Sequence, residues 1–272
     1  MKRPVLVAAL AVIAAAVMLL AYYLIAGRAP APSVGVIYFS AGASPAPLQA
    51  IGYVERGQLY STVTIGGQAA ALGRGLTPEL RGALAGLIAN STMKFGSPNA
   101  PVVVVEYLDP TCPYCAVFSA AYFNYLLQYI NNGTVLYVIR YFPTHVLGYL
   151  QPGGYYPQAF NAGVESWLSL ECIYKRHGPA AALNATEGMY EVAAYYLSAY
   201  MQTNNSTYLL IYPIAEKRYL ESRYPDCAYN LPTDQLEVVV AQAERQITAE
   251  AKALGIPNEM LGTPLFVVFP RP

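Results

Sequence analysis

The stretch from residue 101 to residue 115 reads Pro101-Val-Val-Val-Val-Glu106-Tyr-Leu-Asp-Pro-Thr-Cys112-Pro-Tyr-Cys115. Its four consecutive valines predict a strand that is buried on both faces. Apolar and aromatic residues follow at helical spacing over Pro113–Asn131, so the two cysteines stand where a strand passes into a helix. A thiol at a helix start meets unpaired N–H groups and the positive end of the helix dipole, which stabilise a thiolate. This pattern favours thiol–disulfide exchange chemistry.

The segments around this stretch predict an α/β fold. Thr134–Phe142 is rich in β-branched residues and follows the helix stop at Asn132 and Gly133, so it predicts a second strand, parallel to the first in a right-handed βαβ unit. A last strand is expected over Leu265–Phe269. Helices are predicted over Thr77–Asn90, Gln158–Arg176, Thr186–Gln202, Ser206–Arg223 and Thr233–Leu254.

The N-terminus predicts a membrane anchor. Lys2 and Arg3 precede an uncharged apolar run over residues 5–26, which is long enough to cross a bilayer. The positive-inside rule then places the N-terminus in the cytoplasm and the remainder outside. A cleaved signal peptide is the alternative, but Pro32 stands directly after the candidate cleavage site at Ala31. We therefore expect a transmembrane signal anchor over residues 1–27 and a single-pass cell-membrane protein whose main domain is extracytoplasmic.

Residues 28–76 predict a linker that leads into a hairpin. Arg28–Pro47 is rich in Ala, Pro, Ser and Gly, with one short apolar piece, Val34–Phe39, that could form a strand. Leu48–Ile65 holds two runs of β-branched and aromatic residues on either side of Gly57. Such runs around a glycine are typical of a β-hairpin.

Composition excludes one class of partner and favours export. Sixteen basic and sixteen acidic side chains in 272 residues give a net charge of zero. The sequence therefore lacks the excess of positive charge that is typical of nucleic-acid-binding proteins. Five Asn-x-Ser/Thr sequons fit an exported chain. Four cysteines in such a chain suggest one redox pair and one structural disulfide, although the sequence alone allows three connectivities.

Two residues far apart in the chain could serve the cysteine pair. Glu106 ends the valine strand, six residues before Cys112. Burial there would raise its pKa and make it a proton carrier for the second cysteine, whereas a solvent-exposed strand end is the alternative. Pro264 precedes the last strand. If its peptide bond is cis, Thr263 can offer its backbone to an incoming extended peptide.

Together these features resemble the thioredoxin superfamily and, more narrowly, the Dsb branch of exported thiol–disulfide oxidoreductases. The match runs through Phe95–Val102, the valine strand and the Cys112-Pro-Tyr-Cys115 motif, and it resumes at Ala253–Pro257 and Gly262–Val268. The resemblance implies a thioredoxin-like domain over residues 77–272. It also implies a helical insertion at about 143–254, between the CxxC helix and the cis-proline strand.

The resemblance also implies a role for each site residue. Cys112 would be the exposed nucleophile and Cys115 the buried resolving thiol. Glu106 would be the buried acid below the disulfide, and Pro264 the cis-proline packed against it. The remaining implied roles are substrate contacts for Thr263, Pro113 and Tyr114, and a structural disulfide between Cys172 and Cys227, as in the DsbC/DsbG branch.

The implied activity is that of a protein thiol–disulfide oxidoreductase. Its substrates would be exported proteins with cysteines, and a membrane redox partner would recycle it without a cofactor. Related dithiols span reduction potentials of about −270 to −120 mV, so oxidase, reductase and DsbC/DsbG-type isomerase all stay open. An anchored binding protein with purely structural disulfides is the non-enzymatic alternative. No metal is expected, because the other two cysteines are isolated and neither His145 nor His177 falls at ligand spacing.

One departure from the family pattern concerns the edge of the sheet. The family continues with another strand and a helix after the cis-proline strand, whereas this sequence runs only about two residues beyond it. Either the sheet is truncated or another segment completes it. We expect the hairpin at Leu48–Ile65 to lie beside Leu265–Phe269 as the edge strand.

Overall fold

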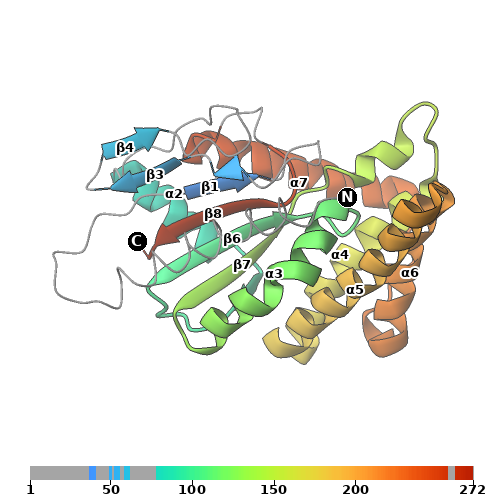
Figure 1. The fold of residues 1–272 in the computed structure, drawn as a ribbon, viewed down its shortest axis with the longest axis horizontal. Coiled ribbons are helices and arrows are strands. Elements are labelled where there is room, and N and C mark those ends of the chain that lie inside the picture. Colours follow the sequence, from blue (N-terminus) through green and yellow to red (C-terminus); the bar gives the residue numbers. More distant parts are fainter. Residues whose placement is uncertain are drawn as a thin grey trace.

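The structure is a computed structural model that describes residues 37–40, 49–50, 52–55, 58–61, 78–256 and 261–271. Most of the described strands lie in the first half of the chain, and helices dominate the second half (Figure 1). The elements are β1 (Ile37–Ser40), β2 (Gln49–Ala50), β3 (Gly52–Glu55), β4 (Gln58–Ser61), α2 (Pro78–Ala89), β5 (Met93–Phe95), β6 (Val102–Leu108), α3 (Pro113–Asn131), β7 (Val135–Tyr141), η1 (Val146–Leu150), α4 (Pro157–His177), α5 (Pro179–Thr203), α6 (Thr207–Arg223), η2 (Pro225–Cys227), α7 (Thr233–Leu254) and β8 (Leu265–Pro270).

The valine strand β6 lies inside the main sheet, whose strand order is β2-β1-β8-β6-β7-β5. All seven residues of β6 are buried, as expected for a strand covered on both faces. β6 and β7 run parallel, with Val102 opposite Val135 and Leu108 opposite Tyr141. The predicted parallel βαβ unit is therefore confirmed. β8 is antiparallel to β6 on its other side.

Alternate residues of β6 enter two different cores. Val102, Val104 and Leu108 pack on the side of α3 and the helices that follow β7. Val103, Val105 and Tyr107 pack on the opposite side, against α2 and the C-terminal half of α7. Figure 1 shows these two helical layers on either side of the sheet. Because the side-chain period of a strand is two, Glu106 shares the face of Val104 and Leu108, toward α3.

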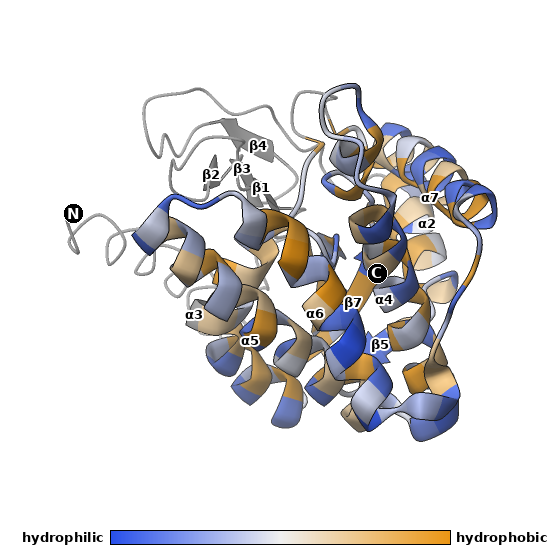
Figure 2. Cartoon of the chain, turned by 90° about the vertical axis from the view of Figure 1, so that its right-hand side faces the viewer, coloured by the Kyte–Doolittle hydropathy of each residue, from blue (hydrophilic) through white to orange (hydrophobic). Residues whose placement is uncertain are grey.

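The predicted helical insertion is present and consists mainly of α4, α5 and α6. Helix α5 packs against both α3 and α6, and Figure 2 shows hydrophobic and hydrophilic residues on all three helices. The expected insertion of about 143–254 includes α7, but the end of that helix packs on the sheet with α2. Helix α5 begins at Pro179, seven residues before the predicted start, because proline suits the first turn and three alanines follow it.

The prediction for the edge strand is wrong. A hairpin does form within Leu48–Ile65, but β3 and β4 pair with each other in a separate two-stranded sheet. The neighbour of β8 is β1, with Ile37 opposite Val268 and Ser40 opposite Leu265. Four extended residues with branched and aromatic side chains suffice to pair one edge of β8. The sequence did indicate a possible strand over Val34–Phe39, but nothing in it related that piece to β8.

The predicted anchor over residues 5–26 lies outside the described residues, as does most of the linker. Within the parts that the structure describes, no helix is long and apolar enough to cross a bilayer. The anchor therefore stays a prediction.

Candidate active site

The cysteine pair lies at the junction of β6 and α3. Cys112 is the N-cap of α3, with extended backbone angles, and Pro113 occupies the first turn, where its missing N–H costs nothing. The Cys112 Sγ accepts a hydrogen bond from the Cys115 backbone N–H at 3.1 Å. The backbone N–H of Cys112 donates to the Asp109 carbonyl oxygen at 2.9 Å. The first thiol thus caps its own helix, as the sequence predicts for a stabilised thiolate.

Both cysteines carry free thiols, and both are fully buried. For Cys112 this corrects the expectation of an exposed nucleophile. The Cys112 thiol donates a hydrogen bond to the Thr263 carbonyl oxygen at 3.2 Å, so the segment before β8 covers it. Pro113 and Tyr114, between the two cysteines, are half-buried.

The Thr263–Pro264 peptide bond is cis, and both residues are buried beside Cys112. The sequence therefore located the proline that the structure brings to the thiol, 149 positions after Cys115. The Thr263 backbone was expected to bind the backbone of a substrate peptide. In this structure its carbonyl oxygen accepts a hydrogen bond from the Cys112 thiol instead.

Glu106 lies below the pair on the α3 face of the sheet and is 2% exposed. The Tyr137 hydroxyl, on the neighbouring strand β7, donates a hydrogen bond to its carboxylate. Burial raises the pKa of Glu106 to about 8, against the opposing hydrogen bond from Tyr137 and with a further rise from the charge of Cys112. This carboxyl can therefore hold or release a proton near neutral pH.

The two thiols have opposite acidities. Burial opposes ionisation of Cys112, but hydrogen bonds from Cys115 and His145 outweigh it and lower its pKa to about 6. For Cys115, burial and the adjacent Cys112 raise the pKa well above its usual value. Of the two thiols, Cys112 is therefore the one that ionises first.

Asp109 holds this arrangement together, and sequence reasoning missed it. Its Oδ1 accepts hydrogen bonds from the Thr111 backbone N–H at 2.9 Å and hydroxyl at 2.8 Å. Its Oδ2 accepts from the backbone N–H groups of His145 at 2.7 Å and Val146 at 3.1 Å. One carboxylate thus joins the loop before α3 to the loop after β7. The Asp-Pro-Thr turn sequence was the available signal, because aspartate often caps the backbone two residues on.

Two more residues that the sequence did not assign to the site, Thr144 and His145, follow β7. The Thr144 hydroxyl lies 2.6 Å from the Thr263 hydroxyl and 2.9 Å from His145 Nδ1. His145 Nδ1 also lies 3.2 Å from the Thr263 hydroxyl. No spacing in the sequence relates these residues to Cys112, so only the fold brings them to the thiol.

The helical insertion reaches the same loop through two buried tyrosines. Tyr190 of α5 donates a hydrogen bond to the Asp109 carbonyl at 3.1 Å. Tyr212 of α6 donates to the Thr111 carbonyl. The insertion therefore fixes the backbone that leads into Cys112.

Helix α4 approaches this loop so closely that only glycine fits at position 163. A Cβ at Gly163 would lie 2.3 Å from Thr111 Cγ2 and 3.1 Å from Val146 Cγ2. We expect Gly163→Ala to lower the free energy of unfolding by about 1–3 kcal/mol, because the added methyl overpacks the contact. Urea denaturation measures the change. The control is Gly82→Ala in α2, where nothing lies within 4 Å of the new methyl. That variant should gain about 0.5–1 kcal/mol, and an equal loss in both would contradict the packing argument.

Glu106→Gln should stabilise the protein increasingly as the pH rises. The pKa of Glu106 is about 8 in the fold against 4.5 for the free side chain. Between pH 4.5 and 8 the folded state keeps a proton on Glu106 that the unfolded state loses. The free energy of unfolding of the wild type therefore falls as the pH rises through this range. Glutamine has no such proton to lose. The variant should match the wild type near pH 4 and exceed it by a few kcal/mol near pH 8, measured by urea denaturation. A difference independent of pH would contradict the assignment.

A disulfide links the helical insertion to itself. Cys172 of α4 and Cys227 of η2 are bonded, with their Cα atoms 5.5 Å apart. His177 and Asp226 lie near Cys227, with possible ligand atoms within 4.8 Å of one another in the described part of the chain. The Cys227 sulfur is already bonded to Cys172, so these three residues do not form a metal site.

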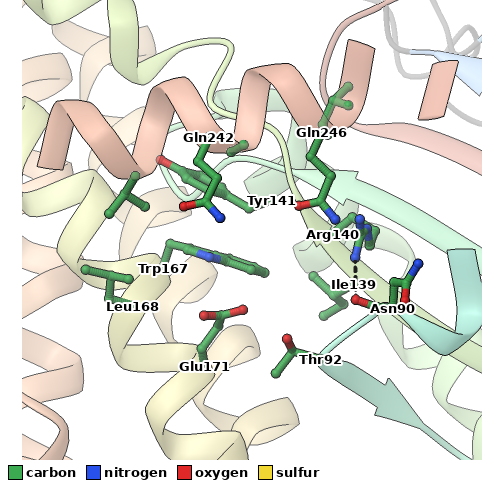
Figure 3. A pocket seen from close by; sticks show the side chains of 13 residues that line it. Asn90, Thr92, Ile139, Arg140, Tyr141, Trp167, Leu168, Glu171, Gln242 and Gln246 are labelled. Carbon is green, nitrogen blue, oxygen red and sulfur yellow. Dashed lines mark hydrogen bonds between the residues drawn. The ribbon is translucent and has the colours of Figure 1, made fainter. Parts of the chain in front are cut away.

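A separate pocket of about 270 Å³ lies between β7, α4 and α7, away from the thiols. Figure 3 shows Gln242 and Gln246 above it, and Glu171 and Thr92 below. Arg140, on its wall, donates to the Asn90 carbonyl oxygen at 3.1 Å and pairs with Glu250.

Comparison with known proteins agrees with the fold. Residues 89–207 match a family model described as thioredoxin. Proteins of Rickettsia typhi and Rickettsia bellii, both named as candidate protein-disulfide oxidoreductases, are 41% identical over 56 residues, or 20% of this chain. The chain thus spans about a fifth of the length of these curated relatives, at 21% and 22%.

Two solved structures are similar at a lower level. Wolbachia pipientis α-DsbA1 is 19% identical, with a TM-score of 0.43 over 67% of this chain and 76% of that one. Oxidised Bacillus subtilis BdbD is 16% identical, with a TM-score of 0.40 over 67% and 83%. Likenesses this distant carry no argument about the site. The match of residues 89–207 to thioredoxin agrees with the βαβ unit around Cys112 and Cys115, the cis-proline before β8 and the helical insertion, which together give this part of the chain a thioredoxin-like fold.

Proposed function

We propose that this chain is a protein thiol–disulfide oxidoreductase that acts through Cys112 and Cys115. The observation that carries the proposal is the pairing of a thiol whose pKa is lowered to about 6 with a second free thiol one helical turn on. A thiolate is the nucleophile in disulfide exchange, and its partner resolves the mixed disulfide. A binding protein with purely structural disulfides has no need of this asymmetry.

In the oxidising direction, a substrate thiolate attacks Sγ of Cys112 in the Cys112–Cys115 disulfide. The bond between the two enzyme sulfurs breaks, a mixed disulfide forms at Cys112, and Cys115 leaves as a thiolate that takes up a proton. The second substrate thiolate then attacks the substrate sulfur of the mixed disulfide. Oxidised substrate leaves, and the enzyme is left with Cys112 as thiolate and Cys115 as thiol.

Glu106 suits the proton transfers at Cys115. Its charge raises the pKa of Cys115, so the two groups lie close enough to affect each other. Its own pKa of about 8 lets it give a proton to the leaving Cys115 thiolate and take it back in the reverse direction.

Substrate access requires a local movement. Cys112 is fully buried, and the backbone of Thr263 bonds directly to its sulfur. An incoming peptide that pairs with the Thr263 backbone would replace this bond and uncover the thiol at the same time. Thr263, Pro113 and Tyr114 are accordingly the substrate contacts in this proposal.

The natural setting in the proposal rests on the sequence. The apolar run at residues 5–26 would anchor the domain on the extracytoplasmic side, where disulfides persist. Exported proteins with cysteines would be its substrates, and a membrane redox partner would restore its working state. The chain spans only a fifth of its curated relatives, so their activity is not transferred as a whole.

The test is exchange activity of the purified protein in both directions. Oxidised enzyme should speed disulfide formation in a reduced, unfolded substrate, and reduced enzyme should speed reduction of insulin. Recovery of a scrambled substrate would favour the second candidate, a reductase or isomerase of the DsbC/DsbG type. A pair that resists mild reductant and has no fast-alkylating thiol would overturn the oxidoreductase proposal.

A further inference from the structure

The CxxC helix contains no charged side chain. Helix α3 reads PYCAVFSAAYFNYLLQYIN, and the two residues between the cysteines are Pro113 and Tyr114. The motif itself therefore supplies no cation to Cys112. Helix α3 offers a thiolate only its dipole and the hydrogen bond from the Cys115 backbone N–H, and burial works against both.

One basic side chain from another part of the fold lies against this thiol. The chain has two histidines, His145 and His177. His177 is exposed at the end of α4, where its Nε2 lies 3.1 Å from Asp226. His145 is half-buried in the loop after β7, 33 residues beyond Cys112, and its imidazole faces the Cys112 sulfur.

Thr263 holds the thiol and the imidazole together. Its carbonyl accepts the Cys112 thiol at 3.2 Å, and its hydroxyl lies 3.2 Å from His145 Nδ1. The Thr144 hydroxyl fixes the same ring nitrogen at 2.9 Å. The His145 backbone N–H is fixed by Asp109 at 2.7 Å. These three contacts hold the ring in a fixed position within the site.

We propose that His145 is the cation that stabilises the Cys112 thiolate, and that it thereby makes the pair an oxidant. The proposal rests on the proposed function and deepens it, because it assigns the direction of electron flow. The thiolate exists only in the reduced enzyme. An imidazolium beside it therefore lowers the free energy of the reduced form alone and favours transfer of two electrons from the substrate dithiol to the enzyme disulfide.

The groups around His145 favour its charged form. Burial lowers the pKa of His145, but Cys112 and the Asp109 carboxylate outweigh it and raise the pKa above its usual value. The other polar groups against the ring, the hydroxyls of Thr144 and Thr263, are neutral. Glu106, below the pair, and Glu216, on α6, both have raised pKa values because they are buried. Neither acid therefore neutralises the imidazolium below pH 7.

The test is His145→Gln in the full-length protein, with His177→Gln as the matched control. Thiolate absorbance against pH gives the pKa of Cys112, and equilibration with glutathione gives the redox equilibrium constant. An adjacent opposite charge shifts a pKa by about 1–3 units. His145→Gln should therefore raise the pKa of the Cys112 thiol by at least about one unit. It should also weaken the enzyme as an oxidant of glutathione about tenfold or more, while His177→Gln changes neither quantity.

Thr263→Val gives a second readout that keeps the imidazole but removes one of its hydroxyl partners. We expect a shift in the same direction and smaller than that of His145→Gln. A folded His145→Gln protein with unchanged thiol pKa and unchanged equilibrium constant would overturn the role of His145 while leaving the oxidoreductase intact. A wild-type protein without any low-pKa thiol would instead overturn the proposed function.

Discussion

We expect Cys112→Ser to lose thiol–disulfide exchange entirely, and Cys115→Ser to stop halfway and accumulate mixed disulfides with its substrates. The difference follows from the geometry, since Cys112 caps α3 and is the low-pKa thiol, whereas the pKa of Cys115 is raised by burial. Without Cys112 the pair has no thiol of lowered pKa to act as nucleophile. Without Cys115 the first bond still forms, but no resolving thiol lies near enough to break it.

Non-reducing gels of the purified variants, incubated with a disulfide-containing substrate, measure this outcome directly. Only Cys115→Ser should give a substrate adduct that disappears on reduction. A useful control carries both Cys172→Ser and Cys227→Ser, which leaves the reactive pair untouched. Adducts formed by Cys112→Ser through Cys115 would reverse the assignment of the two thiols.

Removing the Cys172–Cys227 disulfide should have the second largest effect, a loss of about 4 kcal/mol in the free energy of unfolding. The bond closes a loop of 55 residues that contains α5 and α6. Cross-linking the ends of so long a loop restricts the unfolded chain. Urea denaturation of the variant with both cysteines replaced by alanine measures the loss, and the reduced wild-type protein provides a comparison.

The same variant also tests whether this bond is structural. Cys227 is 2% exposed, but a groove of about 560 Å³ runs beside the disulfide between Lys175, Arg176 and Tyr229. A structural bond predicts unchanged exchange activity under conditions where the variant stays folded. Loss of exchange at full stability would mean that Cys172 and Cys227 form a second redox pair.

The reactive core of the site could be predicted because its residues are placed by local rules. Cys112 follows a buried strand and precedes a helix, and Pro264 precedes a strand with a strong β-branched signal. Each of these signals lies within a few residues of the feature that it predicts. The family resemblance then related the two segments across 149 positions, which spacing alone could not do.

The surroundings of the core could not be predicted in the same way. His145 and Asp109 meet because β6 and β7 are parallel neighbours whose ends lie at one edge of the sheet, and neither residue has a sequence partner nearby. The neighbour of β8 was mispredicted for a related reason. Pairing of Ile37–Ser40 with β8 joins segments more than 220 residues apart, and the longer hairpin gave the stronger local signal.

With the proposed anchor at residues 5–26, the position of β1 would limit how far the domain can move from the bilayer. Ten residues, 27–36, separate the apolar run from the first residue of β1. Fully extended, they span at most about 35 Å. The segment before β1 would then be a short tether, and it would keep the cysteine pair close to the membrane surface. Polypeptides that emerge close to that surface would meet it long before freely diffusing ones.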